Sequence, residues 1–301
     1  MKQADVLAHP AKVLGKRQRE EFFDNGFTVV PDYVPQAWLI RLREAAAELI
    51  DRSRTLRQSD GHFILEANHS PDKPSLHRIA SPQEVHPVFW EFFRDPVMTD
   101  LAADVVGPDV KFFHAKLNVK SEKGSGGFKW HHDITAWPHT DFSPVTIGVY
   151  LEDCGIEQGP LAFVPGTNRG ELHRMYDEDG VFTGIDEAVM DRLTGERDVV
   201  RTPARAGSAV LVNCRVIHGS APNKSELPRP LLLPVYSSAD SFPYTPNPVP
   251  SIQSGELVRG SPARYASFDT FQCLLPPDFR TKQSAPWEKK AADNAAAAPT
   301  M

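Results

Sequence analysis

The stretch VTIGVYLEDCGIEQGPLAFVPGTNRG, residues 145–170, is the segment from which the fold can be inferred. It opens with a run of β-branched and aromatic residues, passes through the turn-forming EQGP, and continues into a second apolar run, LAFVP, before the turn PGTNRG. Short apolar runs separated by glycine- and proline-containing turns are typical of strands in a sheet. The segment therefore predicts two short strands joined by a turn.

Further strands are predicted on both sides of this stretch. KFFHAKLNVK (111–120) precedes it, while SAVLVN (208–213) and LLLPVYS (231–237) follow it. The sequence shows neither an internal repeat nor the alternation of strands and helices that a doubly wound parallel sheet requires. We therefore predict a mainly β protein, an antiparallel sandwich or barrel, with helices packed outside.

The helices are predicted ahead of the strands. Residues 17–25, closed by Gly26, and residues 35–52 show one-sided apolar spacing, and a further helical region runs from about 84 to 106. Between the first two helices, FTVV (27–30) predicts a strand. We expect one domain over residues 1–280, with a helical part at about 17–106 and a β core at about 107–280. The tail, 281–301, offers little that could be buried and is predicted to be disordered.

Composition argues against several classes of protein. The 301 residues carry a net charge of −6, which does not suit a nucleic-acid partner. Cys154, Cys214 and Cys273 show no CxxC spacing and indicate reduced thiols. No apolar stretch approaches the length of a membrane span. We expect a cytoplasmic protein, a monomer or homodimer, with a small-molecule substrate and neither a membrane nor a nucleic-acid partner.

The segment FKWHHDITAW (128–137) carries the first candidates for chemistry. His131 and Asp133 are two residues apart, so on a strand their side chains would point to the same face. His218 follows far downstream, just after the strand predicted at 208–213. Two histidines and one carboxylate on one face of a metal leave other positions open, as in non-haem Fe(II) oxygenases. His132, between the ligands, would point to the opposite face and is expected to be structural.

Arg229 adds specificity to this pattern. It lies eleven residues after His218, at the start of the apolar run LLLPVYS. A buried arginine needs an acidic partner because its guanidinium cannot shed its charge. 2-Oxoglutarate would supply one, since its keto acid end chelates iron and its far carboxylate suits a bidentate fork. Taken singly, HxD is a weak pattern and Arg229 fits a solvated surface position; together with His218 they form a fairly specific signature.

The stretch from about Phe112 to Tyr236 resembles the phytanoyl-CoA dioxygenase family, and its motifs are nearest to ectoine hydroxylase-like members. The resemblance rests on WHHD, LEDCGIEQGPLAFVPGTNRG and NCRVIHGSAPNKSELPR. It implies a double-stranded β-helix core of the jelly-roll or cupin type, with Fe(II), 2-oxoglutarate and O₂ as cofactor and co-substrates. It further implies hydroxylation of a small organic molecule, such as an amino acid, a phosphonate or a secondary metabolite, with release of succinate and CO₂.

Carried over position by position, the resemblance implies roles for individual residues. His131, Asp133 and His218 would be the catalytic iron ligands, and Arg229 would bind the distal carboxylate of 2-oxoglutarate. The remaining co-substrate residues would be Ser220, Thr146, Asn118, Lys120 and Phe128. Trp137 would face the substrate, with His114, His139 and Lys116 as weaker candidates. His114 stands where ectoine hydroxylase has a glutamine, which argues against ectoine itself. Because Asp133 is present, halogenation, for which related enzymes lack this carboxylate, is disfavoured.

Two other interpretations use the same residues. A barrel that binds a metal or small molecule without turnover would be expected to have lost part of the set, which is intact. A zinc hydrolase on a related barrel would accept two histidines, an aspartate and water, but it leaves Arg229 without a role. Metal identity and oxygen dependence would separate these possibilities from a dioxygenase.

Overall fold

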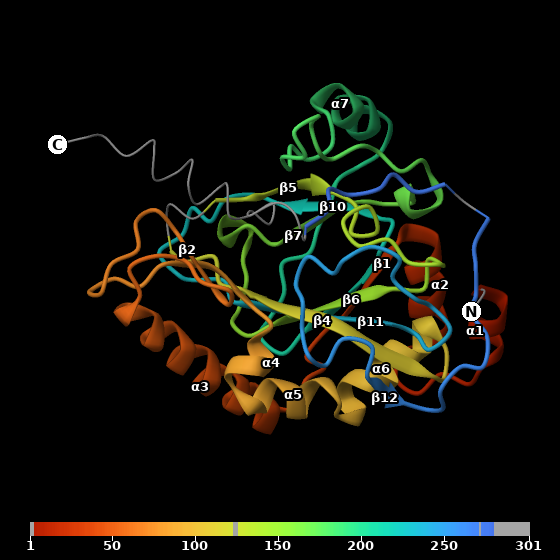
Figure 1. The fold of residues 1–301 in the computed structure, drawn as a ribbon, viewed down its shortest axis with the longest axis horizontal. Coiled ribbons are helices and arrows are strands. Elements are labelled where there is room, and N and C mark those ends of the chain that lie inside the picture. The colour runs from red at the N-terminus through yellow and green to blue at the C-terminus, as the bar shows by residue number, and fades with distance from the viewer. Residues whose placement is uncertain (1–2, 123–125, 271, 280–301) are drawn as a thin grey trace.

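Two antiparallel β-sheets packed face to face form the protein, and most of its helices lie outside the larger sheet (Figure 1). The computed structural model describes residues 3–122, 126–270 and 272–279. Within them the helices are α1 (Gln3–Ala8), α2 (Lys16–Asn25), α3 (Gln36–Arg52), α4 (Pro82–Val85), α5 (Pro87–Phe93), α6 (Pro96–Val106) and α7 (Glu187–Glu196). The strands are β1 (Phe27–Val30), β2 (Phe63–Leu65), β3 (Leu76–Ala80), β4 (Val110–Asn118), β5 (Phe128–His131), β6 (Val145–Tyr150), β7 (Leu161–Val164), β8 (Val200–Arg201), β9 (Ala209–Asn213), β10 (Ile217–Ser220), β11 (Leu231–Ser238) and β12 (Leu257–Arg259). The arrangement is the expected double-stranded β-helix, or jelly roll.

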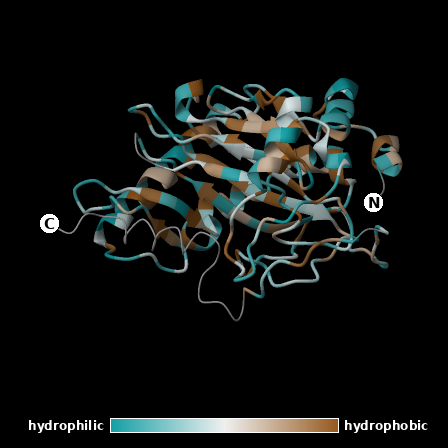
Figure 2. Ribbon diagram, turned by 90° about the horizontal axis from the view of Figure 1, so that it is seen from above, coloured by the Kyte–Doolittle hydropathy of each residue, from teal (hydrophilic) through white to brown (hydrophobic). Residues whose placement is uncertain are grey.

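The larger sheet has its strands in the order β1-β9-β6-β11-β4-β3-β2, with β12 paired to β4. Its middle strands β6 and β11 are buried along their whole length. Helices α3, α5 and α6 pack on one face and the smaller sheet packs on the other, so both faces need apolar side chains (Figure 1). Hydrophobic residues are frequent along the strands in the middle of the molecule (Figure 2). This double burial explains why these two strands are continuous apolar runs and not alternating ones.

The smaller sheet, in the order β5-β10-β7-β8, closes the sandwich. Phe163 of β7 stacks on Phe27 of β1, with ring centroids 4.2 Å apart and planes inclined by 7°, and so joins the two sheets. On the other side of the smaller sheet, Met190 and Leu193 of α7 pack against Val164 and Ile217. The sheet is therefore fixed from both sides, which holds β5 and β10 in place as a support for side chains.

The predicted helices are present, but prolines divide one of the predicted helical regions into separate helices. Helix α2 ends at Gly26, which has the left-handed φ of 86° that glycine tolerates. The helical region predicted at 84–106 consists of α4, α5 and α6, because Pro87 and Pro96 each begin a new helix. The side chains of His86 and Asp95 accept hydrogen bonds from the first turns of these helices.

Three details differ from the sequence prediction. The part predicted as helical also contributes β2 and β3 to the larger sheet. The prediction that His131 and Asp133 share one strand is wrong, since β5 ends at His131 and Asp133 follows in a bend. In β4, His114 pairs with Val235 and Phe112 with Tyr236, so Phe113 forms a bulge that interrupts the alternation.

One hydrophobic cluster includes residues of α2, α3, α5, α6 and the larger sheet. None of the helices in the described residues is long and apolar enough to cross a membrane. The tail predicted to be disordered, 281–301, lies outside the described residues.

Candidate metal centre and its cavity

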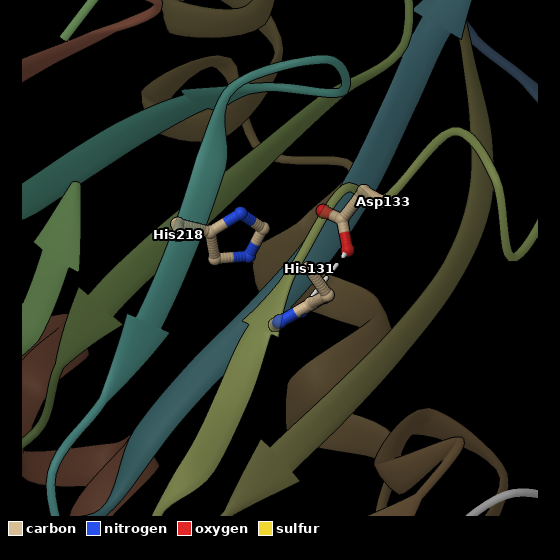
Figure 3. A group of neighbouring side chains, drawn as sticks. All are labelled: His131, Asp133 and His218. Carbon is tan, nitrogen blue, oxygen red and sulfur yellow. Dashed lines mark ion pairs between the residues drawn. The ribbon is translucent and has the colours of Figure 1, made fainter. Parts of the chain in front are cut away.

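Three side chains that can bind a metal converge on the smaller sheet (Figure 3). His131 ends β5, His218 lies opposite it on β10, and Asp133 reaches in from the bend that follows β5. Their potential ligand atoms all lie within 4.8 Å of one another, and His131 Nε2 is 3.8 Å from an Asp133 carboxylate oxygen. This spacing suits one metal ion held from one side.

Neighbouring groups orient each of the three side chains. Nδ1 of His131 lies 2.7 Å from the carbonyl oxygen of Lys129, and Nδ1 of His218 lies 3.1 Å from that of Val216. A carbonyl oxygen accepts a hydrogen bond from Nδ1–H, so the lone pair of each ring is on Nε2, where it can bind a metal. The hydroxyl of Thr146 donates to Asp133 at 2.7 Å and fixes the carboxylate.

The electrostatics keep His131 and Asp133 in the protonation states that bind a metal. Burial, together with His218, holds the pKa of His131 well below its ordinary value, so its imidazole is neutral. Burial alone would raise the pKa of Asp133, but His218, Lys116 and the Thr146 hydrogen bond contribute to a net lowering. Neutral imidazoles and an ionised carboxylate are the forms that a metal requires.

A buried cationic cluster extends from the same strand. Ser220 is two residues from His218 on β10, and its hydroxyl accepts a hydrogen bond from Lys120 at 2.8 Å. Lys120 also donates to the carbonyl of Gly159 at 3.1 Å, and Arg229 donates to that same carbonyl at 3.3 Å. Arg229 is only 1% exposed, burial lowers its pKa, and its Nε and Nη1 have no partner among the described residues. Such a guanidinium suits an anionic group that the chain itself does not supply.

Gly159 makes this cluster possible. Its φ is +65°, and a Cβ there would collide with the carbonyl oxygen of Ala221 and lie 2.9 Å from Lys120 Nζ. In the turn predicted from EQGP, the carbonyls of Gly159 and Ala221 therefore both accept from Lys120, and no residue larger than glycine fits at position 159.

A cavity of about 320 Å³ opens onto His131 and Asp133. Phe128 and Trp137, both predicted as site residues, line it. Its other walls include Arg78, Lys116 and a segment that contributes Met175, Tyr176 and Phe182. Phe182 lies against His131 with ring centroids 6.1 Å apart, so this segment borders the metal ligands directly.

Several predicted residues have neighbours other than those expected. Thr146, which was predicted to contact 2-oxoglutarate, donates a hydrogen bond to Asp133 in the structure. Asn118 accepts a hydrogen bond from Arg78 Nε at 2.9 Å. His114 and His139 pack against Trp137 and are not among the residues that line the cavity, although they were predicted as weak substrate contacts. His132 bonds the carbonyl of Arg215 at 2.6 Å, which fits the structural role predicted for it.

Four residues that line the cavity were not predicted from the sequence: Arg78, Met175, Tyr176 and Phe182. Arg78 gave a usable signal, because it is a charged residue inside the apolar run LHRIA, all of which is buried in β3. The other three lie in the segment after β7, where no periodicity marks a side chain as facing the cavity.

The jelly roll presents two histidines and an aspartate, and a buried arginine without an acidic partner in the described residues lies nearby. These features place the protein in the class of non-haem iron, 2-oxoglutarate-dependent dioxygenases. The sequence profile described as "Phytanoyl-CoA dioxygenase (PhyH)" matches residues 22–231. The chain belongs to that family.

Individual relatives support the same class. A probable alpha-ketoglutarate-dependent hypophosphite dioxygenase of Stutzerimonas stutzeri is 24% identical over 231 residues, which cover 75% of this chain and 79% of that protein. An ectoine dioxygenase of Bordetella parapertussis is 27% identical over 245 residues, covering 77% and 78%. The crystal structure of EctD from S. alaskensis with bound Fe has a TM-score of 0.69 at 19% identity, covering 86% and 92%, and confirms the fold.

Proposed function

We propose that this chain hydroxylates a small organic molecule with Fe(II), 2-oxoglutarate and O₂, and that His131, Asp133 and His218 hold the iron. The observation that carries the proposal is Arg229, whose buried guanidinium has two nitrogens without partners in the described residues. A zinc hydrolase gives this arginine no task, whereas the distal carboxylate of 2-oxoglutarate would satisfy both nitrogens. Ser220 and Lys120, joined to the same cluster, would complete the carboxylate site.

The donor set fits Fe(II) without change. Two imidazoles and one carboxylate leave coordination positions for a bidentate co-substrate and for oxygen. When bound, iron and 2-oxoglutarate supply the oxidation, in which the co-substrate becomes succinate and CO₂ and an oxygen atom enters a substrate C–H bond. Thr146 would keep Asp133 oriented, and the carbonyls of Lys129 and Val216 would keep both imidazoles turned toward the metal.

The surroundings of the metal support a small substrate. Phe128, Trp137 and Phe182 give the cavity apolar walls, and its volume of about 320 Å³ suits an amino acid, a phosphonate or a compact secondary metabolite. We further propose a cytoplasmic location, which the three free cysteines support. A monomer or a homodimer, without a nucleic-acid partner, remains our prediction for the assembly.

Anaerobic addition of Fe(II) and 2-oxoglutarate to the apo-protein tests the assignment. We expect the weak visible band of an iron–keto acid chelate in wild type, its loss in His131→Ala, and its retention in the exposed control His9→Ala. Iron binding without the band, in wild type, would mean that 2-oxoglutarate is not a co-substrate, and the two alternatives of a non-catalytic barrel or a hydrolase would then stand. Succinate release on aeration in the presence of a substrate would separate an enzyme from a non-catalytic barrel.

A further inference from the structure

Lys116 places an unpaired ammonium group in the wall of the metal cavity. It lies on β4, where His114, Lys116 and Asn118 alternate toward the interior of the sandwich beyond the bulge at Phe113. Lys116 lines the cavity, is partly buried, and makes no hydrogen bond or ion pair with any residue that the structure describes. An ammonium group has three protons to donate, and removing it from water without an acceptor is costly.

Arg78 brings a second cation to the same wall from the neighbouring strand β3. Residues 78 and 118 are register partners, and Arg78 Nε donates to Asn118 at 2.9 Å, which fixes the guanidinium in place. Arg78 is 6% exposed and its guanidinium lies 5.8 Å from the ring centroid of Phe128. The two cations therefore lie on adjacent strands, and Asn118 holds the guanidinium of Arg78 in place.

The cavity wall offers Lys116 little compensation. Asp133 is the single carboxylate among the described residues that line the cavity, and it is hydrogen-bonded to Thr146 and grouped with the two histidines; its charge offsets only part of the lowering of the Lys116 pKa by burial. Much of the remaining wall is apolar, including Phe128, Trp137 and Phe182. A neutral substrate filling this space would exclude water and leave the ammonium group of Lys116 without an acceptor.

We propose that Lys116 and Arg78 form an oxyanion subsite, and that the substrate carries a carboxylate or phosphonate group that binds there. The inference rests on the proposed function and deepens it, because it assigns the charge of the substrate and the residues that select it. A lysine supplies a compact point charge and an arginine supplies a planar fork, a pair suited to an oxygen-rich anion. The apolar walls then bind the body of the molecule, and the iron ligands lie in the same cavity.

Matched probes test the proposal on the protein loaded with Fe(II) and 2-oxoglutarate under argon. Calorimetric titrations compare N-acetylglycine with N-acetylglycinamide, and ethylphosphonate with its diethyl ester, so that each pair differs in charge. We expect wild type to bind the anionic member of at least one pair about tenfold or more tightly than the neutral member. The pair that shows the preference identifies the oxyanion as a carboxylate or a phosphonate.

Variants assign the preference to the subsite. Lys116→Met is expected to lower the affinity for the anionic probe by about tenfold or more. The affinities for the neutral probe and for 2-oxoglutarate should stay within about twofold of those of wild type. Lys116→Arg should restore most of the preference. Lys111→Met is the control, because Lys111 lies on the same strand but donates to the carbonyl of Ser241 outside the cavity. Circular dichroism and thermal melts establish that each variant is folded.

Three results would overturn the proposal: equal affinity of wild type for charged and neutral probes, an unchanged preference in Lys116→Met, or a loss of 2-oxoglutarate binding alone. The last result would assign Lys116 to the co-substrate. Failure of the proposed function is recognised separately, because wild type would then not bind 2-oxoglutarate in the presence of Fe(II) at all.

Discussion

Replacing Arg229 by methionine should raise the stability of the apo-protein and at the same time weaken its binding of 2-oxoglutarate. The guanidinium is 1% exposed, its one hydrogen bond in the described residues is 3.3 Å long, and two of its nitrogens have no partner there. Lys120, another buried cation, shares the acceptor carbonyl of Gly159. Methionine fills a similar volume without charge, so Arg229→Met removes an uncompensated buried cation and leaves little empty space.

The gain in stability of the apo-protein and the loss of 2-oxoglutarate binding energy should have opposite signs and similar size. Replacing poorly compensated buried charge with apolar side chains is worth about 1–4 kcal/mol of stability. For a chain of 301 residues the entropy of unfolding is roughly 0.6 kcal/mol per kelvin, so the apo-variant should melt about 2–6 °C higher than wild type. Loss of a buried charge pair costs about 2–5 kcal/mol of binding, which weakens 2-oxoglutarate by roughly 30-fold to 5,000-fold.

Thermal melts with redox-inert Mn(II), with and without 2-oxoglutarate, measure both effects. At a hundred times its dissociation constant, 2-oxoglutarate should stabilise wild type by about 2.7 kcal/mol and the variant by almost nothing. Arg43→Met is the matched control: Arg43 is paired with Glu152 at 2.8 Å and with the carbonyl of Leu151 at 2.6 Å, so its loss should lower the melting temperature. An apo Arg229→Met that melts below wild type, or one that 2-oxoglutarate stabilises fully, would refute the reasoning.

Three further predictions concern other parts of the structure. Thr146→Val removes the hydrogen bond that orients Asp133 and should weaken Fe(II) binding by about 10-fold to 100-fold in an anaerobic titration, while unchanged affinity would show that the hydroxyl has no such role. Phe163→Ala removes a fully buried ring stacked between the sheets and should cost about 3–5 kcal/mol in urea unfolding, whereas a cost under about 1 kcal/mol would contradict its place in the core. Burial lowers the pKa of Lys116 to about 8, whereas the unfolded chain keeps this proton to about pH 10, so the unfolded state binds more protons between these values. The stability of wild type relative to Lys116→Met should therefore rise as the pH is raised from 8 to about 10, and parallel stability curves would be the contrary result.

The strands that could be predicted from the sequence are those buried on both faces. VTIGVY and LLLPVYS stand out because each is an uninterrupted apolar run, and that continuity reflects a sheet covered on both sides. The strands β2 and β3 could not be found in the same way, since they are short and LHRIA contains two charged or titratable side chains. Their place in the sheet depends on pairing with β4, which is distant in sequence.

For the candidate site, local spacing carried less information than the combination of distant residues. His131, Asp133 and His218 lie together at the smaller sheet, although Asp133 is not on a strand. Arg229 is linked to Ser220 of β10 through the carbonyl of Gly159 and the ammonium group of Lys120. A hydroxyl on a neighbouring strand, such as that of Thr146, can serve a co-substrate or a metal ligand, and its 2.7 Å hydrogen bond to Asp133 could not be read from the sequence. The charge of Arg78 within LHRIA was a usable local signal, but the site that this side chain reaches depends on the register of β3 with β4, which no local pattern encodes.

The charges of the buried site divide it into two parts with different occupants. Fe(II) and Arg229 together would be balanced by Asp133 and the two carboxylates of 2-oxoglutarate. Lys120 donates to the oxygens of Gly159, Ser220 and Ala221 and belongs to the co-substrate end of the site. Lys116 lines the cavity and makes no hydrogen bond or ion pair among the described residues. Because Fe(II) and 2-oxoglutarate carry equal and opposite charges, their binding leaves this cation in the cavity wall, where an anionic group of the substrate would pair with it.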